Sequence, residues 1–267
     1  AASDLKVKSV PGFSGQMAGS AFTSNGTLFA GDNNYTLYRS DNNGTTFRAV
    51  YHFVPQVNPS SAVTGYLWNI FIDSRNYIFV SIPSTNRLYR STNWGATFRQ
   101  VLNTNGSQND GFYIAMTEDN QRNLYAATYC NSIYPQQHPA VLKSTNGGLN
   151  WIKVASFATV HLHNVKFNPT NGYLYAVTGE WTYGFDNWDC ERVFRSKDKG
   201  QTWSTVVERP IEMEAQGNTV YLPMLLDGNW VYLGSDQAFQ PNWIDRFYDD
   251  GSNNAFGVQR AYCFPTS

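Results

Sequence analysis

Residues 194–203 read FRSKDKGQTW, and this short stretch decides the fold. An aromatic residue, an arginine and a serine end one strand-like run, and a tryptophan opens the next. Between them lie Asp198 and Gly200. Glycine accepts the positive φ of a tight turn, and an aspartate side chain bonds turn amides. The stretch therefore predicts a β-hairpin.

The same pattern recurs along the chain. Residues 38–47 read YRSDNNGTTF, residues 89–98 read YRSTNWGATF, and residues 142–151 read LKSTNGGLNW. A degenerate fifth copy, residues 246–251, keeps the arginine, the aspartate and the glycine but has lost the serine. The five glycines are 51 to 53 residues apart, and so regular a period indicates a repeat architecture. They are Gly44, Gly95, Gly148, Gly200 and Gly251.

Each repeat also holds two further strand-like runs upstream of its hairpin, joined by a short turn. No segment has a convincing helical period. Four strands in about 50 residues are typical of a propeller blade, and blades must stack because none can bury its faces alone. The clearest pairs of runs are 67–72 with 77–81, 162–167 with 173–177, and 220–225 with 230–233.

We therefore predict an all-β fold, a β-propeller of five four-stranded blades, as one domain over residues 1–267. Residues 254–263 or residues 5–9 fasten the ring, and the spare strand is available to another subunit because open edges invite partners. The alternative is a larger ring truncated at its C-terminus. The predicted blades are approximately 11–55, 60–105, 108–156, 158–208 and 215–264, with 1–10 as an extra or closing strand.

The hairpins resemble the Asp-box, or BNR repeat, of sialidase-like β-propellers, Ser-x-Asp-x-Gly-x-Thr-Trp. The resemblance covers nearly the whole chain, one box per blade. Of the four complete copies, three have asparagine in place of the aspartate (Asn42, Asn93 and Asn146), and only the copy with Asp198 keeps it. Asparagine preserves the turn hydrogen bonds. The resemblance implies a folding element on the outer rim of each blade, and proteins such as sialidases, other glycan hydrolases, polysaccharide lyases, lectins and receptor ectodomains.

Composition excludes several classes of protein. The chain has 19 Lys+Arg against 20 Asp+Glu, so no basic excess exists to neutralise nucleic-acid phosphates. Aromatic residues make up 16%, more than the 15% that are charged, which argues against disorder. No run of about 18 apolar residues exists, so we expect no membrane span. The Asn-, Ser-, Thr- and Gly-rich polar fraction suits an extracellular strand-and-turn protein.

The cysteines and sequons also favour a secreted or cell-surface glycoprotein. Cys130 and Cys190 fall in corresponding long loops of neighbouring blades and are predicted to form a disulfide, which leaves Cys263 as the odd one. No Cys/His zinc spacing occurs, so neither a structural metal nor a cofactor is expected. The N-terminal Ala-Ala-Ser fits the end left by signal-peptide cleavage. The sequons are Asn25, Asn34, Asn43 and Asn105.

One face of the propeller is predicted to carry the function. The start of each blade's first strand and the loop after its second strand share that face, which we call the long-loop face. The opposite face has short generic turns, and functional residues tend to sit on long loops held by a rigid scaffold. We expect glycan recognition there, because aromatic faces stack on sugars. The ligand-binding candidates are Asp32, Trp68, Tyr113, Trp181, Trp188 and Asp236.

The alternative for this face is catalysis by a glycoside hydrolase or a polysaccharide lyase. His161 and His163 alternate on one strand, so their side chains point the same way, and Glu180 follows the next strand. Asp32, Glu180 and Asp236 follow three second strands at corresponding positions and offer paired carboxylates. The structural alternatives are that the histidines fill the channel wall and the acids bond turn amides. A cation bound near His161 and His163 is a further alternative.

True sialidase activity is disfavoured. Sialidases clamp a carboxylate with three converging arginines and carry an Arg-Ile-Pro motif, whereas residues 209–211 here read Arg-Pro-Ile. Arg192 is the one evident cation for neutralising a uronate. A third hypothesis is a structural or adhesive subunit that assembles through a terminal strand. The four arginines Arg39, Arg90, Arg195 and Arg246 all belong to the boxes.

Overall fold

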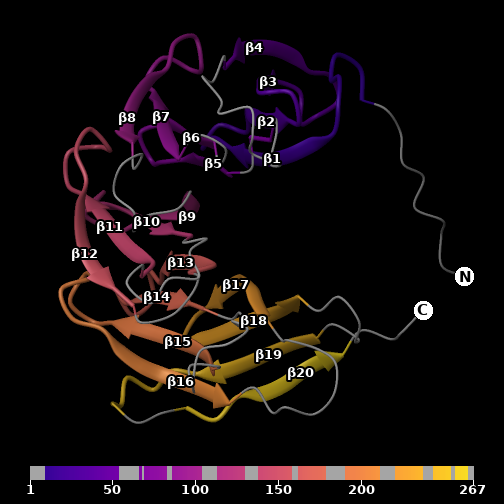
Figure 1. Ribbon diagram of the computed structural model, residues 1–267. Coiled ribbons are helices and arrows are strands. Elements are labelled where there is room, and N and C mark those ends of the chain that lie inside the picture. Colours follow the sequence, from indigo (N-terminus) through magenta and orange to yellow (C-terminus); the bar gives the residue numbers. More distant parts are fainter. Residues whose placement is uncertain are drawn as a thin grey trace, which may run out of the picture. The chain divides into compact units, whose positions relative to one another are not determined.

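The computed structural model confirms an all-β protein with five four-stranded antiparallel sheets (Figure 1). Each sheet is a simple meander, as expected for the blades of a five-bladed β-propeller. Of the predicted strand 254–263, residues Gln259–Cys263 form the outermost strand of the last sheet, whereas residues 5–9 and 254–255 lie outside the described residues. The structure describes residues 10–53, 66–67, 69–82, 86–103, 113–129, 138–157, 162–178, 190–210, 220–236, 243–253 and 256–263.

The strands of each blade follow one another in sequence. Blade 1 comprises β1 (Met17–Phe22), β2 (Leu28–Asp32), β3 (Thr36–Ser40) and β4 (Arg48–His52). Blade 2 comprises β5 (Asn69–Ile72), β6 (Ile78–Ile82), β7 (Arg87–Ser91) and β8 (Arg99–Asn103). Blade 3 comprises β9 (Tyr113–Glu118), β10 (Leu124–Thr128), β11 (Ala140–Ser144) and β12 (Ile152–Ser156). Blade 4 comprises β13 (Asn164–Phe167), β14 (Leu174–Val177), β15 (Cys190–Ser196) and β16 (Ser204–Pro210). Blade 5 comprises β17 (Val220–Asp227), β18 (Trp230–Asp236), β19 (Trp243–Tyr248) and β20 (Gln259–Cys263).

The chain divides into two compact units, residues 1–101 and residues 102–267. The first unit contains blades 1 and 2, apart from the end of β8, and the second contains blades 3 to 5. Within the first unit β1 lies against β5, and within the second unit β13 lies against both β9 and β17. The first strands of consecutive blades are therefore neighbours, as in a propeller. The single-domain organisation stays a prediction.

The repeated hairpin owes its shape to a fixed set of hydrogen bonds. In blade 4 the buried Ser196 hydroxyl accepts a bond from Gly200 N–H (2.8 Å) and donates to Asp198 Oδ1 (2.8 Å). The same oxygen of Asp198 accepts the N–H of Thr202 (2.8 Å), and Gly200 has a φ of 89°. Asparagine makes the equivalent bonds in blades 1 to 3, as predicted. The corresponding turns are anchored by Asn42, Asn93 and Asn146.

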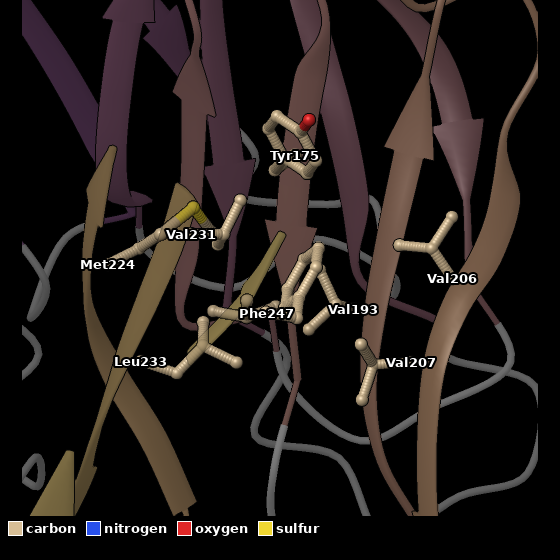
Figure 2. Close-up of a cluster of buried hydrophobic side chains, with 9 residues drawn as sticks. Tyr175, Val193, Val206, Val207, Met224, Val231, Leu233 and Phe247 are labelled. Carbon is tan, nitrogen blue, oxygen red and sulfur yellow. The ribbon is translucent and has the colours of Figure 1, made fainter. Parts of the chain in front are cut away.

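Blades pack through apolar side chains that alternate along their strands. Figure 2 shows the cluster between blades 4 and 5, in which Val193 and Phe247 are at most 1% exposed. Burying one such side chain contributes about 1.5–3 kcal/mol. The remaining labelled members are Tyr175, Val206, Val207, Met224, Val231 and Leu233.

The repeat arginine of blade 4 is buried against blade 5. Arg195 is 1% exposed, and its Nη1 donates to Asp249 Oδ1 of blade 5 at 2.6 Å. The Tyr175 hydroxyl donates to Asp249 Oδ2, also at 2.6 Å. Burial, together with the bond to the carboxylate, raises the pKa of Tyr175. The turn of the next blade therefore covers this arginine. Its position on the outer rim stays a prediction.

In two other blades, the cation at the repeat arginine position also contacts the following blade. Lys143 Nζ donates to the carbonyl of Lys199 at 3.1 Å, and the Arg39 guanidinium lies 5.3 Å from the ring centre of Trp94. These cations therefore help to join neighbouring blades within each unit.

Candidate functional site

The described part of the long-loop face includes one predicted catalytic residue, His163. It lies directly before β13, and its backbone N–H donates to Val177 O at 2.9 Å. The ring is 2% exposed and stacks on Tyr129 of blade 3, with ring centres 5.8 Å apart and planes 12° apart. Burial raises the pKa of the Tyr129 hydroxyl. This packing agrees with the wall-filling alternative for His163, and its catalytic role stays a prediction.

Asp32 is a buried carboxylate that holds a turn. It is 1% exposed, and its Oδ1 accepts the N–H groups of Asn34 and Thr36, both at 2.8 Å. The Tyr38 hydroxyl donates to Oδ2 at 3.2 Å. The bonds shape the connection between β2 and β3. Asp32 therefore fixes the turn between β2 and β3 at the long-loop face of blade 1.

Strand register corrects the expected equivalence of three acids. The residue two before the repeat arginine pairs with Gly31 in blade 1, with Val177 in blade 4 and with Gly234 in blade 5. The residues that follow, Asp32, Thr178 and Ser235, are therefore the structural equivalents. Glu180 lies two residues beyond this position and Asp236 one residue beyond it.

For two ligand-binding candidates, Tyr113 and Asp236, the structure describes the position of the backbone only. Other candidates lie outside the described residues. Tyr113 is the first residue of β9 and pairs with Thr128, whereas Asp236 is the last residue of β18 and pairs with Val220. Both are thus at the long-loop edge of their sheets. The candidates outside the described residues are His161, Glu180, Trp68, Trp181 and Trp188.

The other predicted chemical groups have partial placements. Arg192 donates Nε and Nη2 to Glu208 Oε1, at 2.9 and 2.8 Å, so its guanidinium is committed to an ion pair. Cys190 begins β15 opposite Pro210, but Cys130 lies outside the described residues, and their disulfide stays a prediction. Cys263 is exposed on β20.

Three of the four sequons lie on exposed turns. Asn25, Asn34 and Asn43 are accessible, whereas Asn105 lies outside the described residues. Glycosylation at all four stays a prediction.

At the opposite edge of the blades, side chains in the short turns accept hydrogen bonds from backbone N–H groups of the same turns. In blade 3, Asp119 Oδ1 accepts the N–H groups of Gln121 (2.8 Å) and Asn123 (2.9 Å). Burial acts to raise the pKa of Asp119, but the bonds from the Asn123 side chain and from these N–H groups outweigh it and hold the pKa below its ordinary value. Such turns consume their polar groups internally. The equivalent turns are organised by Asp73 in blade 2 and Asn168 in blade 4.

A second cluster, missed by sequence reasoning, lies at the seam between blades 4 and 5. Asp245 is 1% exposed; its Oδ1 accepts a bond from Arg260 Nε (2.6 Å) and its Oδ2 from Trp243 Nε1 (2.9 Å). The Arg260 guanidinium lies over the Trp243 ring at 3.9 Å. Asp245 belongs to a cavity of about 330 Å³. Its lining is Val207, Glu208, Asp245, Phe256, Gly257, Val258 and Arg260.

One signal in the sequence marks this cluster. Asp245 directly precedes the repeat arginine, a position that is apolar or aromatic in the other four copies. Those residues are Tyr38, Tyr89, Leu142 and Phe194.

The described ranges contain neither a candidate metal cluster nor a candidate membrane-spanning helix. No group of three or more His, Cys, Asp or Glu side chains among these residues is placed to hold a metal ion. His161 is outside those ranges, so a cation near the histidines stays a prediction. In the same part of the chain, no helix is long and apolar enough to cross a membrane.

Comparison with solved structures agrees with the propeller fold. An ancestral GH74 enzyme matches with a TM-score of 0.68 and 16% identity, over 94% of this chain and 32% of that one. The GH74 xyloglucanase from Xanthomonas campestris matches with a TM-score of 0.61 and 17% identity, over 90% and 38% of the two chains. A chain of a nidogen/laminin complex matches with a TM-score of 0.60 and 15% identity, over 94% and 80%.

These similarities are of fold. No family model matches the sequence, and no curated protein is similar to it in sequence.

Proposed function

We propose that this chain is an extracellular propeller that recognises glycans on its long-loop face. The observation that carries the proposal is the contrast between the two edges of its blades. Turns that satisfy their own polar groups occur at both edges, since Asp119 at one edge and Asp32 at the other bond backbone N–H groups in the same way. The edges differ in their loops: the connections at one edge are short, whereas the long sequences rich in Trp, His and acid residues connect strands at the edge of Asp32 and His163. Functional residues concentrate on loops held by rigid scaffolds.

The structural neighbours support this class of partner without naming a ligand. Two are GH74 enzymes, one of them a xyloglucanase, and a third is a chain of a nidogen/laminin complex. Polysaccharide and protein partners are both represented on related folds. The aromatic-rich loops favour a sugar, because Tyr and Trp rings present large flat faces to C–H surfaces.

Binding to a glycan array tests the proposal. We expect specific binding that is lost when Trp181 and Trp188 are both changed to alanine. The matched control is Tyr262→Ala, which removes a 52% exposed aromatic ring from blade 5 and is expected to keep full binding. Absence of binding to any glycan by the correctly folded chain would contradict the proposal.

The second candidate is a glycan-degrading enzyme, favoured by the similarity to two GH74 folds. It requires His161, His163 and Glu180 to act together on a bound chain. Product release from oligosaccharides, including xyloglucan fragments, separates it from pure recognition. Full turnover by His161→Ala and Glu180→Gln would exclude this assignment.

A further inference from the structure

We propose that the cavity between blades 4 and 5, named here the seam pocket, binds a single neutral sugar unit. Its lining residues come from β16, β19, β20 and the segment leading into β20. The inference extends glycan recognition to a second site, and it stands on contacts that do not involve the long loops.

The pocket exists because blade 5 departs from the repeat. In blade 4 the equivalent space holds three rings: Phe157 lies 4.4 Å from Phe194 and 5.4 Å from Trp203, between ring centres. Blade 5 has Asp245 in place of Phe194. A short carboxylate cannot fill the volume of a ring, so space remains at this seam. Two more blades share the ring arrangement, through Phe13, Tyr38 and Phe47 in blade 1 and Phe53, Tyr89 and Phe98 in blade 2.

The charges around the pocket balance. Asp245 is paired with Arg260, and Glu208 is paired with Arg192. An anion near Arg260 would also lie close to the Asp245 and Glu208 carboxylates, and a cation near those carboxylates would lie close to Arg260. A net charge on the ligand therefore meets attraction and repulsion together, and a neutral ligand avoids the repulsion. The pocket therefore favours an uncharged polar molecule.

The lining suits hydroxyl groups on an apolar ring. Carboxylates only accept hydrogen bonds and guanidinium only donates them, whereas a hydroxyl does both. Asp245 and Glu208 offer acceptors, and Arg260 offers donors. Phe256, with Val207 and Val258, provides an apolar wall for C–H groups. The volume of about 330 Å³ is at the small end of ligand pockets, which are about 300–1,000 Å³.

Trp243 provides a built-in reporter. Its indole N–H donates to Asp245 Oδ2, so a sugar hydroxyl that contacts this carboxylate changes the indole N–H resonance. We would titrate the intact chain with glucose, galactose, mannose and N-acetylglucosamine and follow the indole signals by nitrogen–proton NMR. Trp243→Phe assigns the resonance. We expect a saturable shift with at least one of the four sugars.

A blocking variant and a matched control locate the binding. Gly257 lines the pocket, and an added Cβ there meets no atom within 4 Å, so Gly257→Tyr is expected to fold and to weaken the sugar by at least about tenfold. Gln259→Tyr adds the same ring on the other face of the sheet, since Gln259 pairs with Arg246 and not with Asp245, and should keep the affinity. Val258→Phe is the second blocking variant if Gly257→Tyr fails to fold.

Three results would overturn the inference. The first is no shift with any of the four sugars, and the second is an undiminished shift in the blocked variant. The third is a shift only with the charged probes arginine amide or acetate, titrated in the same way. The alanine variant at Trp181 and Trp188 separates the two proposals. It should keep the Trp243 shift even where array binding is lost, so either proposal can fail without the other.

Discussion

Blade 4 packs against blade 3 on one side and blade 5 on the other, and the two seams use different chemistry. Toward blade 3, the rings of Phe157, Phe194 and Trp203 fill the outer part of the seam. Toward blade 5, the same part holds the Asp245–Arg260 pair and a cavity. Elsewhere in that seam, Arg195 and Asp249 form an ion pair with no exposed side-chain surface.

The two seams differ in how their free energy of packing arises. A seam filled by rings gains from burial alone. A seam with buried charges must offset their desolvation, and replacing such charges by apolar groups is often neutral or stabilising. The charged seam of blade 5 therefore contributes less to stability than the ring-filled seams of the other blades. We infer that the charged seam is retained for something other than stability.

The largest effect is expected from Asp249→Ala. The substitution removes the carboxylate that binds Arg195, Tyr175 and the backbone N–H of Gly251. It leaves a buried guanidinium uncompensated, so the free energy of unfolding should fall by about 3–5 kcal/mol. Urea unfolding measures it. Glu208→Gln, which opens the half-exposed pair with Arg192, is the control and should cost about 1 kcal/mol or less. Equal losses in the two variants would contradict this account.

The ring-filled seam is tested by Phe157→Ala. Phe157 is 6% exposed and contacts both Phe194 and Trp203, so truncation leaves a cavity and should lower the free energy of unfolding by about 3–4 kcal/mol. Phe22→Ala in blade 1, where the ring is 60% exposed, is the matched control and should cost about 0.5 kcal/mol or less. A loss below 1 kcal/mol at Phe157, about the size of a surface change, would show that this seam does not depend on its rings.

Ser196→Ala addresses the hairpin that both seams share. The hydroxyl accepts the buried N–H of Gly200, and alanine leaves that donor without its partner. The expected loss is about 1–3 kcal/mol by urea unfolding. Ser204→Ala is the control, because that hydroxyl makes only a long contact of 3.5 Å to Arg195 O. No difference between the two variants would mean that the serine is not needed for the turn.

The hairpin was predictable because its determinants are local. Ser196, Asp198 and Gly200 bond one another within five residues, so the sequence pattern contains the whole turn, and its period gives the number of blades. Asp32 was harder to interpret. A carboxylate after a strand looks the same whether it faces a ligand or bonds turn amides, and only its contacts with Asn34 and Thr36 decide.

The seam pocket could not be predicted in the same way. Its lining joins Val207 of one blade to Asp245 and Arg260 of the next, across more than 35 residues of chain. No local pattern encodes such a meeting. The replaced aromatic at position 245 was the only trace, and its meaning depends on knowing that this position faces the neighbouring blade.

A double substitution converts the charged seam toward the ring-filled one. Asp245→Leu with Arg260→Met removes both charges together and keeps apolar volume. We expect the free energy of unfolding to stay unchanged or to rise by about 1 kcal/mol, because no charge is left unpaired. Asp245→Leu alone should instead lower it, since Arg260 loses its partner. If the double variant is the less stable of the two, the ion pair is itself a stabilising element and the inference drawn from the comparison is wrong.

The smallest effect concerns Asp198, an aspartate at a position that is asparagine in blades 1 to 3 and Asp249 in blade 5. Bonds from Thr202 and Ser196 hold its pKa below the ordinary value of 3.8, although burial opposes the shift. A lowered folded-state pKa means that the carboxylate stabilises the fold above that ordinary value and loses the contribution as pH falls through the folded pKa. Asp198→Asn should therefore show a weaker loss of stability between about pH 5 and pH 2, by less than about 1 kcal/mol because the group is partly exposed. Urea midpoints across that range measure the difference. An identical pH profile would show that the aspartate and asparagine turns are energetically equivalent, and that blade 4 differs from its siblings only at its seams.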